Sequence, residues 1–214
     1  MKKDKKEHLY WANTAATYDA ATAYVVGEGT QRETKAWLLN QLQETDDVLE
    51  LGCGTGQFSE AVAQKARHLT ATEAASEMLD VAKGKMSPFA NVVVQMEDCY
   101  RTTFPDGTFD VVFLGNVIHI LGQPMRALSE SRRVLKPGGR ILVADATSCG
   151  MPFWSKLAMG RRYLRKFGLP PRENRIVSPD DVAQFLEVAG FQVEESRLIQ
   201  KETNVVCVRG RKKT

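Results

Sequence analysis

Three alternate glycines follow a short apolar segment near residue 50, and this feature limits the possible folds more than any other. The segment 48–51 is typical of a strand. The glycines after it are Gly52, Gly54 and Gly56. Because glycine has no Cβ, its backbone reaches positive φ and allows a ligand to approach closely. The helical spacing of residues 57–66 then predicts a helix N-terminus with free N–H groups beside the turn.

The acid at the end of this strand indicates what kind of ligand the turn accepts. A carboxylate at Glu50, two residues before the first glycine, repels phosphate and attracts an ammonium group. The glycines are spaced G-x-G-x-G rather than G-x-G-x-x-G, the dinucleotide fingerprint. Gln57 and Phe58 follow Gly56, where a P-loop would have Lys and Ser or Thr. The pattern favours a nucleoside that carries an amino acid, and the structural alternative is a turn that only packs a helix against a strand.

Length and composition are those of an ordinary soluble domain. The 214 residues form one domain or one domain with a modest insertion, with 26% charged and 43% hydrophobic residues. The net charge of +3, from 29 basic and 26 acidic residues, is too small to favour nucleic acid. Neither a membrane-spanning run nor the apolar core of a signal peptide is apparent, so we expect a cytoplasmic protein.

The cysteines and histidines do not form a metal-binding pattern. Four widely separated cysteines, without a Cys-x-x-Cys pair or a nearby histidine, are typical of reduced thiols. Neither His8 nor His68 lies at the predicted ligand edge. We expect no metal site.

Apolar segments and helical segments alternate from residue 46 onward. The expected strands are 48–51, 67–72, 92–95, 109–114 and 140–144, with Pro137-Gly138-Gly139 opening the last. Such alternation requires crossover connections and hence a mostly parallel sheet. At the end of the chain, a helix at 179–189 precedes strands 191–198 and 203–208, whose four-residue connection permits only antiparallel pairing. We therefore predict an α/β fold: a three-layer, doubly wound, mostly parallel, seven-stranded, Rossmann-like sheet with a C-terminal antiparallel hairpin.

The same pattern divides the chain into four parts. Residues 1–45 are expected to form a helical lid, with aromatic residues at Tyr10-Trp11 and Tyr18 and a helix at 31–43. Residues 46–145 form the cofactor-binding core, and 146–178 form a helical lid over the substrate. Residues 179–214 complete the domain, and the basic residues 209–213 are expected to be a solvated tail.

Ligands of such sheets collect at the carboxyl ends of the strands, so the residues there are candidates for a site. Glu73 can accept hydrogen bonds from both hydroxyls of a ribose. Asp98 can accept from the exocyclic amine of adenine, beside Cys99, and Met78 can cover the adenine face. The structural alternatives are a solvated strand-end acid, a turn cap and a core methionine.

Asn116 and His119 follow the fourth expected strand, where a reacting methyl group would lie. Imidazole is the commonest proton acceptor near neutral pH. His119 is therefore a provisional general base, and the structural alternative is a packed residue at a helix start.

Taken together in order and spacing, these segments resemble class I S-adenosylmethionine-dependent methyltransferases, particularly the type 11 group and its quinone-biosynthesis relatives. The resemblance covers about Tyr10 to Asp145. The segments that carry it are Glu50-Leu51-Gly52-Cys53-Gly54-Thr55-Gly56, Glu73, Met78-Leu79, Asp98, Phe109-Asp110 and Arg133-Val134-Leu135-Lys136-Pro137-Gly138-Gly139.

The resemblance implies S-adenosylmethionine as cofactor. By resemblance, the glycine turn holds the methionyl part, Glu73 the ribose and Asp98 the adenine, while Tyr18 belongs to a lid over the cofactor. Ala74-Ala75 depart from relatives, which often carry an apolar residue and Ser there, so no side-chain contact is expected from these two. The residues expected at the cofactor are Tyr18, Glu50, Gly52, Cys53, Gly54, Gly56, Glu73, Ala74, Met78, Asp98, Cys99 and Asn116.

The chemistry implied is in-line displacement at a sulfonium methyl group, for which the protein mainly aligns the acceptor and excludes water. A base is needed only when the acceptor is a protonated hydroxyl or a carbon acid. Expected acceptors are small or lipid-like molecules. The alternatives are an RNA or protein methyltransferase, a non-catalytic cofactor-binding regulator, and an NAD-linked oxidoreductase, which the glycine spacing disfavours.

The insertion suggests where the acceptor comes from. Helical spacing over 151–168 predicts an apolar side (Phe153, Leu157, Tyr163, Leu164, Phe167) opposite a basic one (Arg161, Arg162, Arg165, Lys166). Such a helix can lie on a membrane surface, and the structural alternative is a lid with solvated arginines. Nucleic acid is not expected, because Gly115-Asn116-Val117-Ile118 lacks the prolines that typically follow the fourth strand in base-directed methyltransferases.

Overall fold

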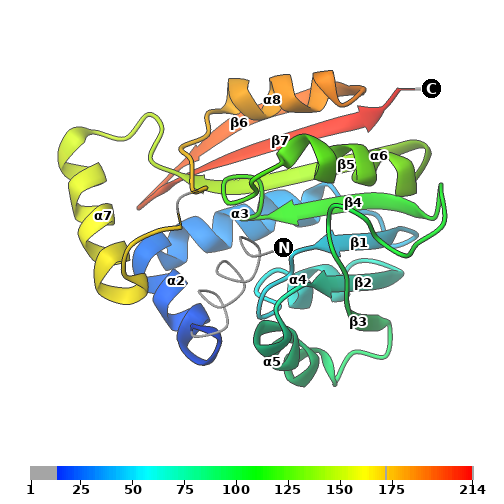
Figure 1. The fold of residues 1–214 in the computed structure, drawn as a ribbon, viewed down its shortest axis with the longest axis horizontal. Helices are drawn as coiled ribbons and strands as arrows, with labels where there is room; N and C mark the ends of the chain where they lie inside the picture. The colour runs from blue at the N-terminus through cyan, green and yellow to red at the C-terminus, as the bar shows by residue number, and fades with distance from the viewer. Residues whose placement is uncertain (1–13, 172, 214) are drawn as a thin grey trace.

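A seven-stranded sheet with the order β3-β2-β1-β4-β5-β7-β6 forms the centre of the computed structural model, which describes residues 14–171 and 173–213 (Figure 1). The first five strands are parallel and the last two are antiparallel to their neighbours. This confirms the predicted fold class. The strands are β1 Asp47–Leu51, β2 His68–Glu73, β3 Val92–Met96, β4 Phe109–Gly115, β5 Leu135–Thr147, β6 Phe191–Gln200 and β7 Asn204–Lys212.

Helices cover both faces of the sheet because successive side chains of a strand point to opposite faces. Val111 and Phe113 of β4 belong to one buried cluster, and Val112 and Leu114 belong to the other. The first cluster is covered by α3 (Glu28–Asn40), α4 (Ser59–Ala63) and α5 (Ser76–Met86). The second is covered by α6 (Pro124–Val134) and α8 (Pro179–Val188).

Two helices far apart in the sequence lie together beyond the carboxyl ends of the parallel strands. They are α2 (Tyr18–Val26), which follows the short 3-10 helix η1 (Ala15–Thr17), and α7 (Phe153–Phe167) (Figure 1). The rings of Tyr18 and Phe167 join them at a centroid distance of 5.9 Å. The predicted helical residues Tyr10-Trp11 and His8 lie outside the described part of the chain.

Two expected element boundaries are wrong. β5 begins at Leu135, directly after α6, so Pro137-Gly138-Gly139 lies inside the strand rather than before it. The register between β4 and β5 shifts between Phe109 and Val111, and Gly138 takes a φ of 71° there, so the extra residues form an irregularity in the strand. The helix expected over 57–66 is shorter, since α4 covers only Ser59–Ala63.

The basic C-terminal segment is not a solvated tail, contrary to the prediction. Residues up to Lys212 belong to β7, which pairs with both β5 and β6. Glu194 of β6 pairs with Arg209 at 3.0 Å and with Arg211 at 2.5 Å. The charge pattern therefore reflects cross-strand pairs rather than solvation.

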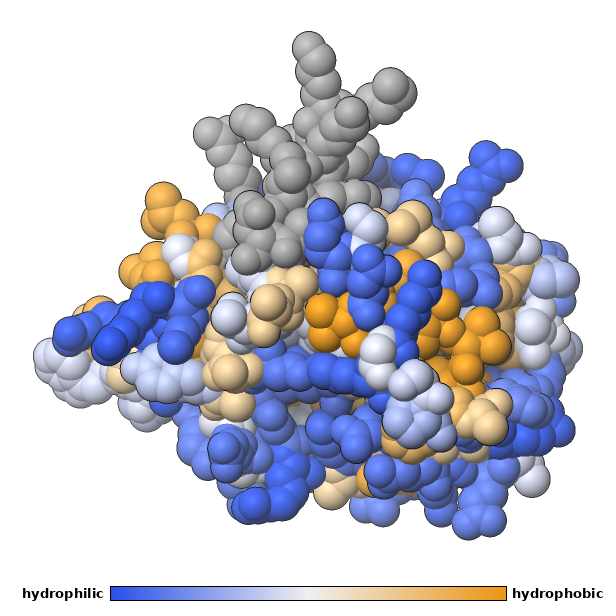
Figure 2. Space-filling view, turned by 90° about the horizontal axis from the view of Figure 1, so that it is seen from below, coloured by the Kyte–Doolittle hydropathy of each residue, from blue (hydrophilic) through white to orange (hydrophobic). Residues whose placement is uncertain are grey.

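α7 is covered on one side only. No residue of α7 is buried. Tyr163 and Phe167 are half-buried against α2, while Phe153 and Trp154 are 70% and 75% exposed. The predicted single apolar side is therefore divided between an inner and an outer face. At the end of the molecule where α7 lies, apolar and charged side chains both reach the surface (Figure 2).

Within the described residues, the helices are all too short or too polar to cross a bilayer.

Candidate functional site

A cavity of about 390 Å³ opens at the carboxyl ends of β1, β2 and β4, where the fold predicts a ligand. All the residues expected at the cofactor line this cavity except Glu50 and Gly56. The fold therefore brings most of the predicted residues together, although they come from segments up to about one hundred positions apart in the sequence.

The glycine turn forms one wall through its backbone. Gly52 has a φ of 71°, and a Cβ at this position would lie 2.7 Å from Val117 Cγ2. Gly54 has a φ of 56° and open space at its Cβ position, so its backbone faces the cavity without obstruction. Gly56 closes the turn by donating to the Cys53 carbonyl at 2.9 Å. Gly56 thus shapes the turn without lining the cavity.

Glu50 does not point into the cavity. Its side chain is buried, and one oxygen accepts a hydrogen bond of 2.6 Å from the Ser59 hydroxyl. Burial raises the pKa of Glu50 to about 7, against the smaller effect of that hydrogen bond. The geometry ties β1 to α4, so direct contact between Glu50 and a ligand ammonium is not supported and stays a prediction.

Glu73 is held at the cavity wall by three backbone donors. One oxygen accepts from the Gly54 N–H at 3.0 Å, and the other accepts from the N–H groups of Ala74 and Ala75 at 2.8 and 2.9 Å. A carboxylate offers about four acceptor positions, so these bonds leave capacity for a ligand hydroxyl. Ala74 contributes its backbone N–H here.

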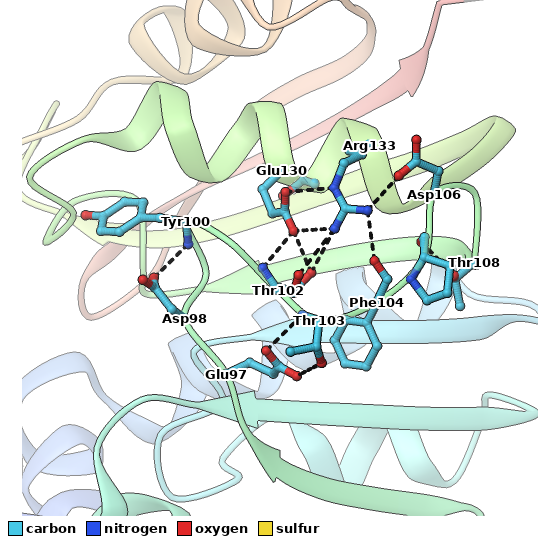
Figure 3. A network of polar contacts seen from close by, with 12 residues as sticks. Glu97, Asp98, Tyr100, Thr102, Thr103, Phe104, Asp106, Thr108, Glu130 and Arg133 are labelled. Atoms are coloured by element: carbon cyan, nitrogen blue, oxygen red, sulfur yellow. Dashed lines mark hydrogen bonds and ion pairs between the residues drawn. The ribbon is translucent and has the colours of Figure 1, made fainter.

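The loop between β3 and β4 carries the acid expected at the adenine. Asp98 Oδ1 accepts from the Tyr100 N–H at 2.8 Å, which fixes the turn that also brings Cys99 to the cavity (Figure 3). The carboxylate is exposed enough to line the cavity while it caps this turn. The two roles considered for Asp98 from the sequence, a turn cap and an acceptor for the adenine amine, are therefore compatible.

A network between this loop and α6 holds the loop in place (Figure 3). Arg133 donates to Glu130 at 2.6 Å, to Asp106 at 2.7 Å and to the Phe104 carbonyl at 2.8 Å. Glu130 also accepts from the backbone and hydroxyl of Thr102, at 2.7 and 2.6 Å. Burial raises the pKa of Glu130, but hydrogen bonds from Arg133 and Thr102 outweigh burial and bring it to about 2. The sequence did not predict these contacts of Arg133, which it indicated only as part of a motif.

Tyr18 approaches the cavity from α2. Burial raises the pKa of its phenol to about 12, so the hydroxyl stays neutral. The next residue, Asp19, accepts from the Thr55 hydroxyl at 2.5 Å and pairs with Lys85 of α5. These contacts attach α2 to the glycine turn.

A second cavity of about 440 Å³ lies between α2 and α7. Most of its wall is apolar, with Val25 and Val26 from α2 and Met159, Tyr163 and Phe167 from α7. Two cationic side chains, Lys156 and Arg175, also line it.

Among the described residues, those that line both cavities are Tyr18, Asn116 and His119. Asn116 has a φ of 59°, a conformation that asparagine tolerates better than most residues. Its side-chain oxygen accepts from the Ala146 N–H at 2.9 Å, and its own N–H donates to the Ala144 carbonyl at 2.7 Å. These bonds fix the segment that carries His119 at the junction between the cavities.

The His119 imidazole pairs through Nδ1 with Asp145, a residue to which the sequence assigned no role. Asp145 is completely buried, and its other oxygen accepts from the Ile118 N–H at 3.1 Å. Because Gly115 of β4 pairs with Ala144 of β5, both side chains fall at the same edge. The position of an acid at the end of the neighbouring strand was the signal that could have identified it.

The described residues contain no group of three or more His, Cys, Asp or Glu side chains that could hold a metal ion. Each of the four cysteines, all within the described ranges, is a free thiol. Burial raises the pKa of Cys53 far above its usual range, so its thiol contributes to the wall as a small apolar group.

Comparison with known proteins finds similar sequences and structures. Residues 49–143 match the model of a methyltransferase domain. A demethylmenaquinone methyltransferase of Listeria welshimeri is 27% identical over 72% of this chain and 68% of its own length. An O-methyltransferase of Penicillium expansum is 29% identical over 92% of this chain and 69% of its own. An S-adenosylmethionine-dependent methyltransferase structure from Aquifex aeolicus has a TM-score of 0.71 and 22% identity, covering 94% of this chain and 97% of that one.

An uncharacterized methyltransferase of Schizosaccharomyces pombe is 29% identical over 65% of this chain. The match covers 53% of the yeast protein, so this chain spans about half the length of that relative.

Proposed function

This chain belongs to the class I S-adenosylmethionine-dependent methyltransferases, and we propose that it methylates a small or lipid-like acceptor bound between α2 and α7. The observation that carries the proposal is the pair of adjoining cavities, which share Tyr18, Asn116 and His119. One cavity suits a cofactor, and the other gives an acceptor access to it. Both volumes fall in the range of small-molecule sites, roughly 300–1,000 Å³.

The first cavity fits the cofactor in its chemistry. The backbone of Gly52 and Gly54 would hold the methionyl part, Glu73 would accept from the ribose, and Asp98 would accept from the adenine amine. When bound, the cofactor supplies an activated methyl group on sulfur. The protein's own contribution is to align the acceptor at the junction and to keep water out of it.

The second cavity favours an apolar acceptor with a polar or anionic group. Its wall is mostly aliphatic and aromatic, and Lys156 and Arg175 place positive charge in it. Relatives named for demethylmenaquinone and for O-methylation support a small-molecule acceptor over RNA or protein. At 27–29% identity they do not name the acceptor of this chain.

The outer face of α7 provides a route by which a lipid-like acceptor can be delivered. Phe153, Trp154 and Leu157 are exposed there. The helix has five basic residues and no acidic one. Aromatic and apolar side chains next to arginines are typical of helices that lie on anionic membrane surfaces. We propose that α7 contacts an anionic lipid surface, with its inner face lining the acceptor cavity.

Cofactor binding by Glu73 can be measured by calorimetry with S-adenosylhomocysteine. The Glu73→Ala variant should bind about 10–100-fold more weakly, because it loses hydrogen bonds from ligand hydroxyls to a charged acceptor. Glu187→Ala, which removes an exposed acid from α8, is the matched control and should bind normally. Unchanged affinity in Glu73→Ala would remove this residue from the site.

Incubation of the protein with a labelled methyl donor and whole metabolite and lipid extracts identifies the acceptor. Label should enter a small or lipid-like species. Label that enters only RNA or protein would contradict the proposed acceptor class. Tight cofactor binding without any labelled product would instead favour a non-catalytic regulator.

Membrane contact is tested with phosphatidylcholine vesicles with and without phosphatidylglycerol. We expect the protein to sediment with the anionic vesicles, less so at high salt, and a Phe153→Ser/Trp154→Ser variant to partition at least about tenfold less. Equal behaviour of the variant and the unaltered protein would show that α7 does not carry the contact.

A further inference from the structure

Asp145 and His119 form a buried acid–imidazole pair where β5 and β4 end. Asp145 is completely buried, and both of its oxygens are occupied, one by His119 Nδ1 and one by the Ile118 N–H. The His119 side chain is only 17% exposed, and its residue lines both cavities. The carboxylate thus reaches the junction only through the imidazole.

The pairing determines which ring nitrogen can act. A neutral imidazole has one N–H donor and one acceptor nitrogen, and an ionised carboxylate can only accept. Asp145 therefore requires the proton of His119 to lie on Nδ1, which leaves Nε2 as the acceptor. This tautomer is the one that a general base at the junction needs.

We propose that Asp145 is a positioning residue that holds His119 as a general base through Nε2, and that the acceptor is a hydroxyl or a carbon acid. This inference rests on the proposed function. It narrows the acceptor to groups that must lose a proton when they are methylated.

The methyl transfer needs only the acceptor, the methyl donor and His119 as proton acceptor. The acceptor oxygen or carbon forms a bond to the methyl carbon while the methyl–sulfur bond breaks and leaves its electron pair on sulfur. The acceptor proton passes to His119 Nε2. The buried charge of Asp145 stabilises the resulting imidazolium, and the proton later leaves to solvent.

A purely structural role for the Asp145–His119 pair does not explain why an imidazole stands at this position. The segment after β4 is already fixed by Asn116, whose backbone and side chain both bond to β5, and by the Arg175 N–H, which donates to the His119 carbonyl at 2.9 Å. None of these bonds requires an imidazole. In addition, Lys156 and Arg175 give the acceptor cavity a positive potential, which favours an acceptor that becomes an anion.

The imidazole tautomer is the first test and needs no substrate. Long-range proton–nitrogen spectra of protein labelled with ¹⁵N in histidine should show His119 protonated at Nδ1 and bare at Nε2. Only three histidines are present, so loss of one signal set in His119→Gln assigns it. A proton on Nε2 in the unaltered protein would overturn the inference.

The Asp145→Asn variant should change the tautomer. Its amide oxygen must accept from the Ile118 N–H, so its NH₂ faces Nδ1 and moves the ring proton to Nε2. An unchanged spectrum in this variant would contradict the positioning role, and a melting temperature close to that of the unaltered protein shows that the variant folds.

Turnover with chemically defined acceptors is the second test. Phenols and a 1,3-diketone are compared with a tertiary amine, which loses no proton when it is methylated, as methyl acceptors. For the hydroxyl and carbon acceptors, Asp145→Asn and His119→Gln should each lower kcat about 100-fold or more. KM and the affinity for S-adenosylhomocysteine should change less than about twofold.

The failures of the two proposals are distinguishable. If the unaltered protein does not bind S-adenosylhomocysteine, the proposed function fails. If it binds but methylates only the tertiary amine, or if the two variants turn over hydroxyl acceptors normally, the inference about Asp145 fails while the proposed function stands.

Discussion

At the scale of single residues, the clearest disagreement between expectation and geometry concerns Glu50. Its position near the carboxyl end of β1 favoured a ligand contact, yet its carboxylate is buried against Ser59 and lies outside the cavity lining. Glu73, by contrast, reaches the cavity with three backbone donors around it. Both are strand-end acids, and only the direction of the side chain separates their roles.

The burial of Glu50 predicts a pH dependence of stability. Its folded-state pKa is raised to about 7 from an ordinary value of 4.5. Below about pH 4.5 both states are protonated and the stability is fully present. As the pH rises from there to about 7, the unfolded chain ionises first, so about 3 kcal/mol of stability is lost. Glu50→Gln, which keeps the acceptor for Ser59, should not show this loss.

Denaturant unfolding at pH 4.5 and pH 8 measures this difference. The matched control is Glu60→Gln, which removes an exposed acid from α4 and should keep the loss of stability. If Glu50→Gln shows the same dependence on pH as the unaltered protein, the carboxyl does not titrate as its burial indicates.

At the scale of elements, the walls of the two cavities are held in place by contacts from segments that contribute no proposed catalytic group. The loop between β3 and β4 has no helix of its own over 97–108, and α6 holds it through Arg133. α2 is attached to the glycine turn through Asp19. The chain after α7 bonds to His119 and Leu121 through Arg175. Each contact links one of these segments to another part of the chain that surrounds the cavities.

Replacement of Arg133 should loosen the loop between β3 and β4, where we propose that adenine binds. Arg133→Met removes donors to Glu130, Asp106 and a backbone carbonyl, and leaves the Glu130 carboxylate mostly buried. We expect a loss of about 1–3 kcal/mol in stability, faster amide exchange over 97–108 and weaker cofactor binding. Denaturant unfolding measures the stability, mass spectrometry measures amide exchange over 97–108, and calorimetry measures cofactor binding.

Arg132→Gln is the control for this prediction, because it changes the preceding residue of α6, whose contact to the Lys213 carbonyl lies outside the loop. Equal exchange in the two variants over 97–108 would contradict a specific role for Arg133.

At the scale of the whole molecule, the two cavities arise from parts of the chain that are distant in sequence. α2 comes from the N-terminal part and α7 from the insertion, and the core lies between them in sequence (Figure 1). The N-terminal helices are also joined to the C-terminal hairpin, since Glu202 accepts from the backbone and hydroxyl of Thr30 at 2.8 and 2.9 Å. The second cavity, the proposed acceptor site, is therefore a product of tertiary packing.

Substitutions in the two cavities should have separable effects. Asp98 lines only the first cavity and Met159 only the second. Asp98→Asn should weaken cofactor binding about tenfold without changing KM for the acceptor, and Met159→Ala should do the reverse. Calorimetry and steady-state kinetics with the acceptor identified above measure both quantities. If Met159→Ala weakened cofactor binding as strongly as Asp98→Asn, the two cavities would not be functionally distinct.

Much of the fold followed from local patterns. The alternation of apolar strands with helices predicted a mostly parallel sheet, and the short connection before Asn204 predicted the antiparallel end. The strand boundaries were less accurate at Pro137-Gly138-Gly139. Leu135 pairs with Phe109 of β4, and pairing with β4 and β7 continues from Arg140, so β5 runs through residues that break most strands. The basic residues after 208 were predicted to form a solvated tail, because Glu194, the partner of Arg209 and Arg211, is not adjacent to them in the sequence.

The sequence by itself determined the sheet, the glycine turn and the acids at the strand ends, since these depend on backbone conformation and on periodicity over a few residues. Only the tertiary structure decided that Glu50 faces Ser59, that Asp145 meets His119, and that α2 and α7 enclose a second cavity. The physical reason is that side-chain direction and burial depend on neighbours from other elements. Local residue patterns carry no record of which neighbours those are.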